Sequence, residues 1–150
     1  MLAFEISRLK DIPAHQFKIL TQMGLENNTN PDLAEAELII DALIGYGLSG
    51  DPRQPVAGWI GKANDSGTPI LALDAPSGLD ATTGVPGNPC IKATDTLTLA
   101  LPKTGLITRE VEDFVGELYL ADISVPAELY QQMGVEVPNL FAEDSIIKVN

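Results

Sequence analysis

Two carboxylates stand at or near the ends of apolar runs, where a ligand could be bound. Asp41 interrupts the apolar run 38–44, and Asp74 ends the run 69–74. In open α/β sheets, ligands bind beyond the carboxyl ends of the strands, so two such residues can converge on one pocket. Spacing alone also allows each carboxylate simply to cap the turn that follows it. Both residues are therefore candidates for a site.

Each carboxylate is followed by a loop rich in small residues. Residues 45–51 read Gly-Tyr-Gly-Leu-Ser-Gly-Asp, and the three glycines let the backbone approach a ligand closely. The loop 75–84 contains Ser77, whose hydroxyl could join the carboxylates. Oxygen atoms of this kind suit a polar ligand or a hard cation. Zinc is not expected, because the single histidine and single cysteine are far apart in sequence.

Other familiar chemistries are poorly supported by the sequence. Ser77 lacks the glycine two places before it that a nucleophile elbow requires, and His15 is a poor candidate base. Residues 45–47 are only a fragment of a dinucleotide-binding fingerprint. We expect Lys103 to be a loop cation that could reach an anionic ligand. The residues alone indicate a ligand-binding α/β domain.

Alternating strand and helix patterns position these loops. An apolar run broken only by a carboxylate, as at 38–44 and 69–74, is typical of a strand buried on both faces. Strand, helix and strand in succession imply a largely parallel sheet with right-handed crossovers. The patterns predict strands over 2–6, 38–44, 69–74, 93–101 and 116–123, an edge strand over 146–149, and helices over 13–23, 55–66 and 127–133.

Composition limits the partners of the chain. Its 150 residues amount to one domain, and 9 basic against 21 acidic residues give a net charge of -12. Nucleic-acid binding relies on Lys and Arg, so it is not expected. No apolar run approaches the roughly 18 residues that a membrane span requires, and no secretion signal is evident. We expect a soluble, cytoplasmic protein that contacts neither nucleic acid nor membrane.

Four motifs occur in one order along the chain and together form a recognisable pattern. They resemble the YjeF N-terminal domain family, the NAD(P)H-hydrate epimerases, over roughly residues 37–126. The resemblance implies a three-layer Rossmann-like α/β sandwich, and an activity that interconverts the R and S epimers of hydrated NADH or NADPH (NADHX and NADPHX). The motifs are DALIGYGLSG at 41–50, LDAPSGLD at 73–80, KATDTLT at 92–98 and LPKTGL at 101–106.

The resemblance also implies roles for single residues. It points to a potassium ion held by Asp41 and Ser77, and to Asp74 as a substrate contact. We expect Asp74 to be the catalytic residue, because epimerising a carbon that bears a hydroxyl requires protonating a leaving oxygen. The further substrate contacts that it implies are Gly45, Tyr46, Gly47, Leu48, Ser49, Gly50 and Asp51.

The chain departs from the family pattern in two places. Tyr46 stands where the family usually has a threonine, and its larger side chain is expected to crowd the phosphate or nicotinamide region. The family's early loop, Gly-Asn-Asn-Gly-Gly-Asp-Gly, has no counterpart, because Asn27 and Asn28 are followed by Thr-Asn-Pro. We therefore interpret residues 1–150 as one partial domain, truncated at its N-terminal end.

Three hypotheses remain open at this point. The chain could be an epimerase whose missing elements come from a second subunit or a separate polypeptide. It could instead be a non-catalytic domain that binds a nucleotide or metabolite, or that dimerises. A fragment without retained function is the third possibility. A sheet without its first unit would expose an apolar edge or face, so the first two hypotheses predict self-association, most simply as a homodimer.

Overall fold

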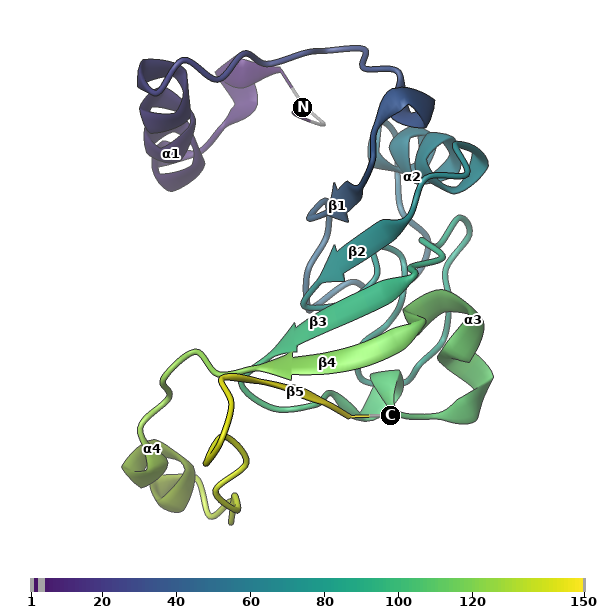
Figure 1. Ribbon diagram of the computed structural model, residues 1–150. Coiled ribbons are helices and arrows are strands. Elements are labelled where there is room, and N and C mark those ends of the chain that lie inside the picture. Colours follow the sequence, from purple (N-terminus) through teal and green to yellow (C-terminus); the bar gives the residue numbers. More distant parts are fainter. Residues whose placement is uncertain (1, 3–4, 150) are drawn as a thin grey trace.

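The computed structural model describes residue 2 and residues 5–149. Within this part of the chain, five strands form one sheet in the order of the sequence (Figure 1). The first four strands are parallel, and the fifth runs antiparallel to the fourth. The predicted α/β class with a mostly parallel sheet is confirmed. The strands are β1 (Ile39–Asp41), β2 (Ile70–Leu73), β3 (Asp95–Leu99), β4 (Glu117–Ala121) and β5 (Ile146–Lys148).

The helices also follow the predicted pattern. The helices expected at 13–23, 55–66 and 127–133 correspond to α1 (Asp11–Gln22), α2 (Val56–Asp65) and α4 (Ala127–Gln132). Pro13 lies in the first turn of α1, where a missing N–H removes no hydrogen bond within the helix. The α-helices are α1 (Asp11–Gln22), α2 (Val56–Asp65), α3 (Glu112–Val115) and α4 (Ala127–Gln132), and the 3-10 helices are η1 (Ile6–Arg8), η2 (Leu33–Glu35), η3 (Thr104–Leu106) and η4 (Arg109–Val111).

One face of the sheet is covered by helices and carries the core. Ile70 and Ala72 of β2 pack in one buried cluster with Val56, Ile60 and Ala63 of α2. A second buried cluster joins β4, α3 and the loop that follows β2. Because side chains alternate along a strand, this covered face also holds the side chain of Asp41, which pairs in register with Ala72. The side chain of Asp41, at the end of β1, is therefore held on the covered face of the sheet.

The opposite face is more open. Leu73 at the end of β2 is 36% exposed, and Ile40 in β1 is 58% exposed. The prediction that both strands are buried on both faces was wrong for β1 and held only in part for β2. The physical reason is that α2 packs on the other face of the sheet, so the side chains of Ile40 in β1 and Leu73 in β2, which point to the open face, stay exposed. Strand β1 is also shorter than the predicted 38–44.

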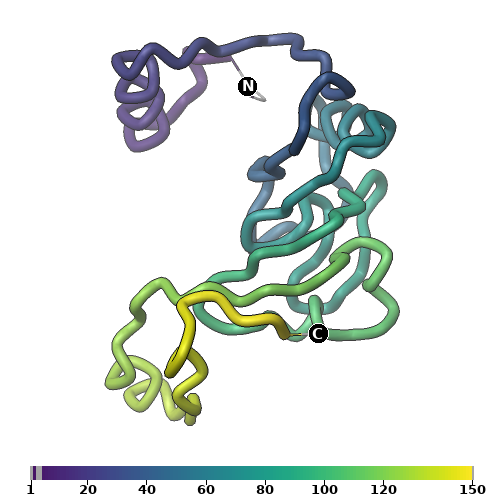
Figure 2. The backbone as a smooth tube through the Cα atoms, in the orientation of Figure 1, coloured from purple at the N-terminus to yellow at the C-terminus, as the bar shows by residue number. Residues whose placement is uncertain are grey.

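The N-terminal segment lies apart from the sheet. Figures 1 and 2 show α1 standing away from the strands, and this helix has no buried residue. The strand expected at 2–6 is not seen: residues 3 and 4 lie outside the described part, and Ile6 begins η1. In the described residues, no helix is long and apolar enough to cross a membrane.

Candidate active site

Asp41 and Ser77 form a buried hydrogen-bonded pair at the end of β1. The hydroxyl of Ser77 donates to Oδ1 of Asp41 at 2.7 Å, and the backbone N–H of Ser77 donates to Oδ2 at 2.7 Å. The N–H of Leu43 adds a longer bond to Oδ1, at 3.3 Å. The pair forms because β1 and β2 are parallel neighbours, so the loop after β2 passes over the end of β1. The structure thus brings together the two residues expected to bind potassium.

In the described part of the chain, hydrogen-bond donors rather than a cation face the carboxylate of Asp41. The ion pairs formed by the described residues are Lys103–Asp74 and Lys148–Glu117, so no cationic side chain pairs with Asp41. Burial raises the pKa of Asp41 above its ordinary value, although the hydrogen bonds from Ser77 and Leu43 oppose this effect. A cation beside Asp41 would relieve this cost.

The donor atoms at this place suit a hard monovalent cation. Beside the carboxylate lie the hydroxyl of Ser77 and the carbonyl oxygen of Ile44, which is 3.2 Å from that hydroxyl. All of them are oxygen atoms, as hard cations prefer. Across the described residues, no group of three or more His, Cys, Asp or Glu side chains could hold a metal ion. Because the donors are oxygen atoms, their chemistry fits a hard cation such as potassium better than a soft transition metal.

The turn after Ser77 depends on a glycine. Gly78 has a φ of +104°, and a Cβ atom there would lie 2.6 Å from the carbonyl oxygen of Pro89 and 2.7 Å from Cα of Cys90.

Cys90, which lies against this turn, is a buried thiol. Its burial, and to a lesser extent the charge of Asp41, raises the pKa of the thiol to about 12. Cys90 therefore fills space as a buried, protonated thiol.

The glycine-rich loop 45–51 lies against the loops that follow β2. The N–H of Ile44 donates to the hydroxyl of Ser77 at 2.8 Å, and Oδ1 of Asp51 accepts the N–H of Asn88 at 2.8 Å. The hydroxyl of Tyr46 lies 3.4 Å from that of Thr82. The loop is therefore fixed at its two ends, and Tyr46 near its start contacts the loop that follows β2.

Asp74 has a different environment. Its backbone adopts a left-handed conformation with a φ of +69°, and its N–H donates to the carbonyl oxygen of Leu97 at 2.9 Å. Its Oδ1 accepts a bond from the ammonium group of Lys103 and a long one from the N–H of Leu99, at 3.4 Å. No described residue donates to Oδ2. The side chain is 23% exposed, so Asp74 is partly open to solvent.

The role expected for Lys103 needs correction. The sequence suggested a loop cation that could reach an anionic ligand. In the structure its ammonium group contacts Asp74, the hydroxyl of Thr98 and the carbonyl oxygen of Leu99. One signal could have indicated this pairing: Asp74 and Lys103 follow neighbouring parallel strands, so their loops lie at the same end of the sheet.

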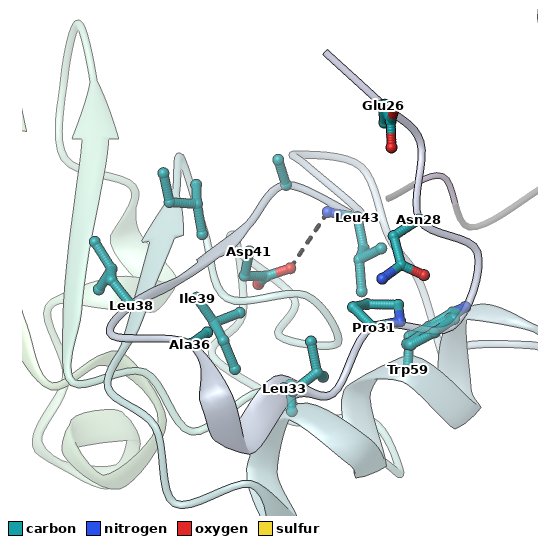
Figure 3. A pocket seen from close by; sticks show the side chains of 13 residues that line it. Glu26, Asn28, Pro31, Leu33, Ala36, Leu38, Ile39, Asp41, Leu43 and Trp59 are labelled. Carbon is teal, nitrogen blue, oxygen red and sulfur yellow. Dashed lines mark hydrogen bonds between the residues drawn. The ribbon is translucent and has the colours of Figure 1, made fainter.

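A cavity that the sequence did not predict lies beside the edge strand β1. It has a volume of about 350 Å³ and is bounded by β1, by α2 and by the segment before β1 (Figure 3). Asp41, Leu43 and Trp59 are among its lining residues, and Figure 3 marks the bond between the first two. Neither Asp74 nor any residue of the loop 45–51 lines it. Asp41 therefore borders this cavity on one side and the Ser77 turn on the other.

The comparison with protein families identifies the kind of domain. Residues 3–105 match the family described as YjeF-related protein N-terminus. The chain belongs to this family. The match begins well before the first of the four sequence motifs, and it includes Asp41, Asp74, Ser77 and Lys103.

Individual relatives carry closely related names. The chain is 36% identical over 130 residues to an NAD(P)H-hydrate epimerase of Dehalogenimonas lykanthroporepellens, covering 85% of this chain and 51% of the relative. It is 39% identical over 121 residues to one of Weissella koreensis, covering 79% of this chain and 55% of that protein. A bifunctional NAD(P)H-hydrate repair enzyme of Moorella thermoacetica is 39% identical over 114 residues, which are 75% of this chain and 22% of the enzyme.

A solved structure supports the fold. The crystal structure of the yeast protein ynu0 is similar with a TM-score of 0.60 and 23% sequence identity, over 75% of this chain and 46% of that one. The chain thus spans about half the length of the two epimerases and of this structure.

Proposed function

We propose that this protein is an NAD(P)H-hydrate epimerase, which interconverts the R and S epimers of hydrated NADH and NADPH. The observation that carries the proposal is the bonding of the Asp74 carboxylate. Asp74 lies in a family motif, its Oδ1 is anchored by Lys103, and no described residue donates to its Oδ2. The names of the relatives supply the reaction.

In this proposal, Asp74 handles the proton of the reaction. The two epimers differ at a ring carbon that bears a hydroxyl group. Asp74 protonates the hydroxyl oxygen, the C–O bond breaks, and water is released. When water adds to the opposite face of the carbon, the proton returns to the carboxylate. No electrons are gained or lost overall, so the step is acid–base chemistry.

The loop 45–51 and the Asp41–Ser77 pair would hold the substrate and a potassium ion. The carboxylate of Asp41, the hydroxyl of Ser77 and the carbonyl of Ile44 supply oxygen donors of the right chemistry. When bound, potassium contributes positive charge next to a loop that would face an anionic substrate. Residues Gly45, Tyr46, Gly47, Leu48, Ser49, Gly50 and Asp51 would contact that substrate, together with Asp74.

We also propose that two copies associate through the open face of the sheet. Ile40 and Leu73 are exposed there, and Leu71, Leu97 and Leu99 of the same face are only partly buried. Apolar surface of this kind favours a partner. The same observation favours a second candidate function, a non-catalytic assembly domain. If light scattering shows a monomer at every concentration, both the proposed dimer and the assembly function are contradicted.

The reduced cofactors that this reaction repairs point to the cytoplasm as the place of action. This placement rests on the proposed substrate. Fractionation of the producing cells, with immunodetection of the chain, would test it.

The direct test of the proposed function is an epimerisation assay on the full chain. Purified R epimer of NADH hydrate is incubated with the protein in potassium chloride or in sodium chloride at equal ionic strength, and the epimers are separated by chromatography. We expect turnover above the uncatalysed rate, faster with potassium, and no potassium effect in Ser77→Ala. Uncatalysed rates from folded protein in both salts would contradict the proposal and favour the assembly role.

A further inference from the structure

We infer that Lys103 is a positioning residue that selects which oxygen of Asp74 exchanges the proton. The inference rests on the proposed function and extends it to a residue with no assigned role. Lys103 and Asp74 are 29 residues apart in sequence, and their side chains are 18% and 23% exposed. The pair is thus largely screened from water and still open on one side.

The ammonium group of Lys103 has no donor left for a ligand. A lysine carries three N–H donors and no acceptor. Lys103 donates to Oδ1 of Asp74, to the hydroxyl of Thr98 at 2.9 Å and to the carbonyl oxygen of Leu99 at 2.9 Å. Three acceptors meet three donors, so Lys103 acts on a substrate through Asp74.

The acceptors belong to a rigid part of the molecule. Thr98 is fully buried, and both Thr98 and Leu99 lie in β3, which pairs with strands on each side. The chain turns sharply after β3, where Ala100 has a φ of +64°, so that Lys103 returns over the end of its own strand. Asp74 is thereby held against β3 by a cation that is itself fixed by β3.

This arrangement makes the two oxygens of Asp74 different. Oδ1 accepts from Lys103 and from the N–H of Leu99, whereas no described residue donates to Oδ2. A proton on Oδ1 would face the N–H groups that already point at that oxygen, which is unfavourable. The proton that Asp74 gives and takes is therefore carried on Oδ2.

The test compares two lysine–carboxylate pairs in the full chain. Lys103→Met removes the charge and all donors while keeping much of the length of the side chain. Lys148→Met is the matched control, because Lys148 pairs with Glu117 at 2.9 Å at an exposed place. With R-epimer hydrate as substrate, we expect kcat to fall about 100-fold in Lys103→Met while KM stays within about threefold. Lys148→Met should retain the wild-type kcat and KM.

A second variant separates positioning from a general loss of structure. Lys103→Ala leaves room for a small amine, so propylammonium should restore kcat at least about tenfold in this variant and leave the wild type unchanged. Thr98→Val, which removes one acceptor of the ammonium group, should lower kcat less than Lys103→Met does.

The possible failures can be told apart. If the wild type turns over and Lys103→Met keeps kcat within about threefold, the inference is wrong and the proposed function stands. If folded Lys103→Ala is inactive and propylammonium restores nothing, Lys103 has only a structural role and the inference is again wrong. If the folded wild type itself shows no turnover, the proposed function fails, and the role of Lys103 fails with it.

Discussion

Asp41 and Asp74 stand at or just beyond the carboxyl ends of two neighbouring parallel strands, yet their surroundings differ in every respect that matters for chemistry. Asp41 is 3% exposed and has both oxygens engaged by Ser77, whereas Asp74 is partly exposed and paired with Lys103 through one oxygen. A carboxylate engaged on both oxygens suits a fixed structural or cation-binding role. A carboxylate with one free oxygen suits proton exchange.

The comparison of Asp41 with Asp74 can be tested through the turn that holds Ser77 against Asp41. The largest effect on stability is expected from a substitution of Gly78 in this turn. A methyl group in Gly78→Ala meets backbone atoms at 2.6 and 2.7 Å, and φ is positive, so the turn that places Ser77 on Asp41 must shift. We expect the free energy of unfolding to fall by about 3 kcal/mol, from strain and overpacking together. The measurement is urea denaturation followed by circular dichroism.

Gly47→Ala provides the control for that variant. Gly47 also has a positive φ, of +107°, but nothing lies within 4 Å of the added atom. It should cost only about 1 kcal/mol, from the backbone strain alone. Equal losses in the two variants would show that the close packing of the Ser77 turn is unimportant.

The next effect separates the two carboxylates themselves. Asp41→Ala leaves the hydroxyl and the N–H of buried Ser77 without their shared acceptor, which should lower the free energy of unfolding by about 2 kcal/mol. Asp74→Ala should cost less than Asp41→Ala, because the Asp74 side chain is partly exposed and only its Oδ1 accepts bonds from the described residues. The same urea titration checks both variants. If Asp74→Ala proves the more damaging of the two, the division between a structural and a reactive carboxylate is wrong.

The smallest effect concerns pH. The pKa of Asp41 is raised in the folded protein, so the protonated form is favoured there. This contribution to stability is fully present below the ordinary pKa of 3.8 and is lost as the pH rises through the folded pKa. Asp41→Asn, which mimics the protonated form, removes this dependence.

The measurement is the free energy of unfolding of the wild type and of Asp41→Asn between about pH 4 and 7, in sodium salts. The other carboxylates titrate alike in both proteins and cancel in the difference. Stability of the wild type relative to the variant should fall as the pH rises, because only the wild type loses a bound proton at this position. A difference that stays constant across this range would refute the raised pKa.

The sequence was sufficient for much of the fold and for part of the site. Periodicity predicted α1, α2, α4 and the five strands to within a few residues, because these elements follow local apolar patterns. The pairing of Asp41 with Ser77 was implied by the family motifs. The motifs lie at the ends of neighbouring strands, so a match to them also indicates which loops lie side by side.

Other features depend on contacts that local patterns do not contain. The exposure of Ile40 depends on which elements cover the second face of the sheet, and an apolar run does not say whether it has a neighbour on each side. The bond between Lys103 and Asp74 depends on a turn after β3 and on the side-chain conformation of a long, flexible residue. The cavity beside β1 depends on the path of the segment before that strand.

The central claim is that Asp74 reacts with the substrate while Asp41 holds the structure and a cation. The most direct measurement is the rate of epimerisation of R-epimer hydrate by Asp74→Asn, together with its free energy of unfolding. We predict a fall in kcat of about 1,000-fold with unfolding free energy within about 1 kcal/mol of the wild type. A folded Asp74→Asn protein that epimerises the hydrate at the wild-type rate would contradict the account.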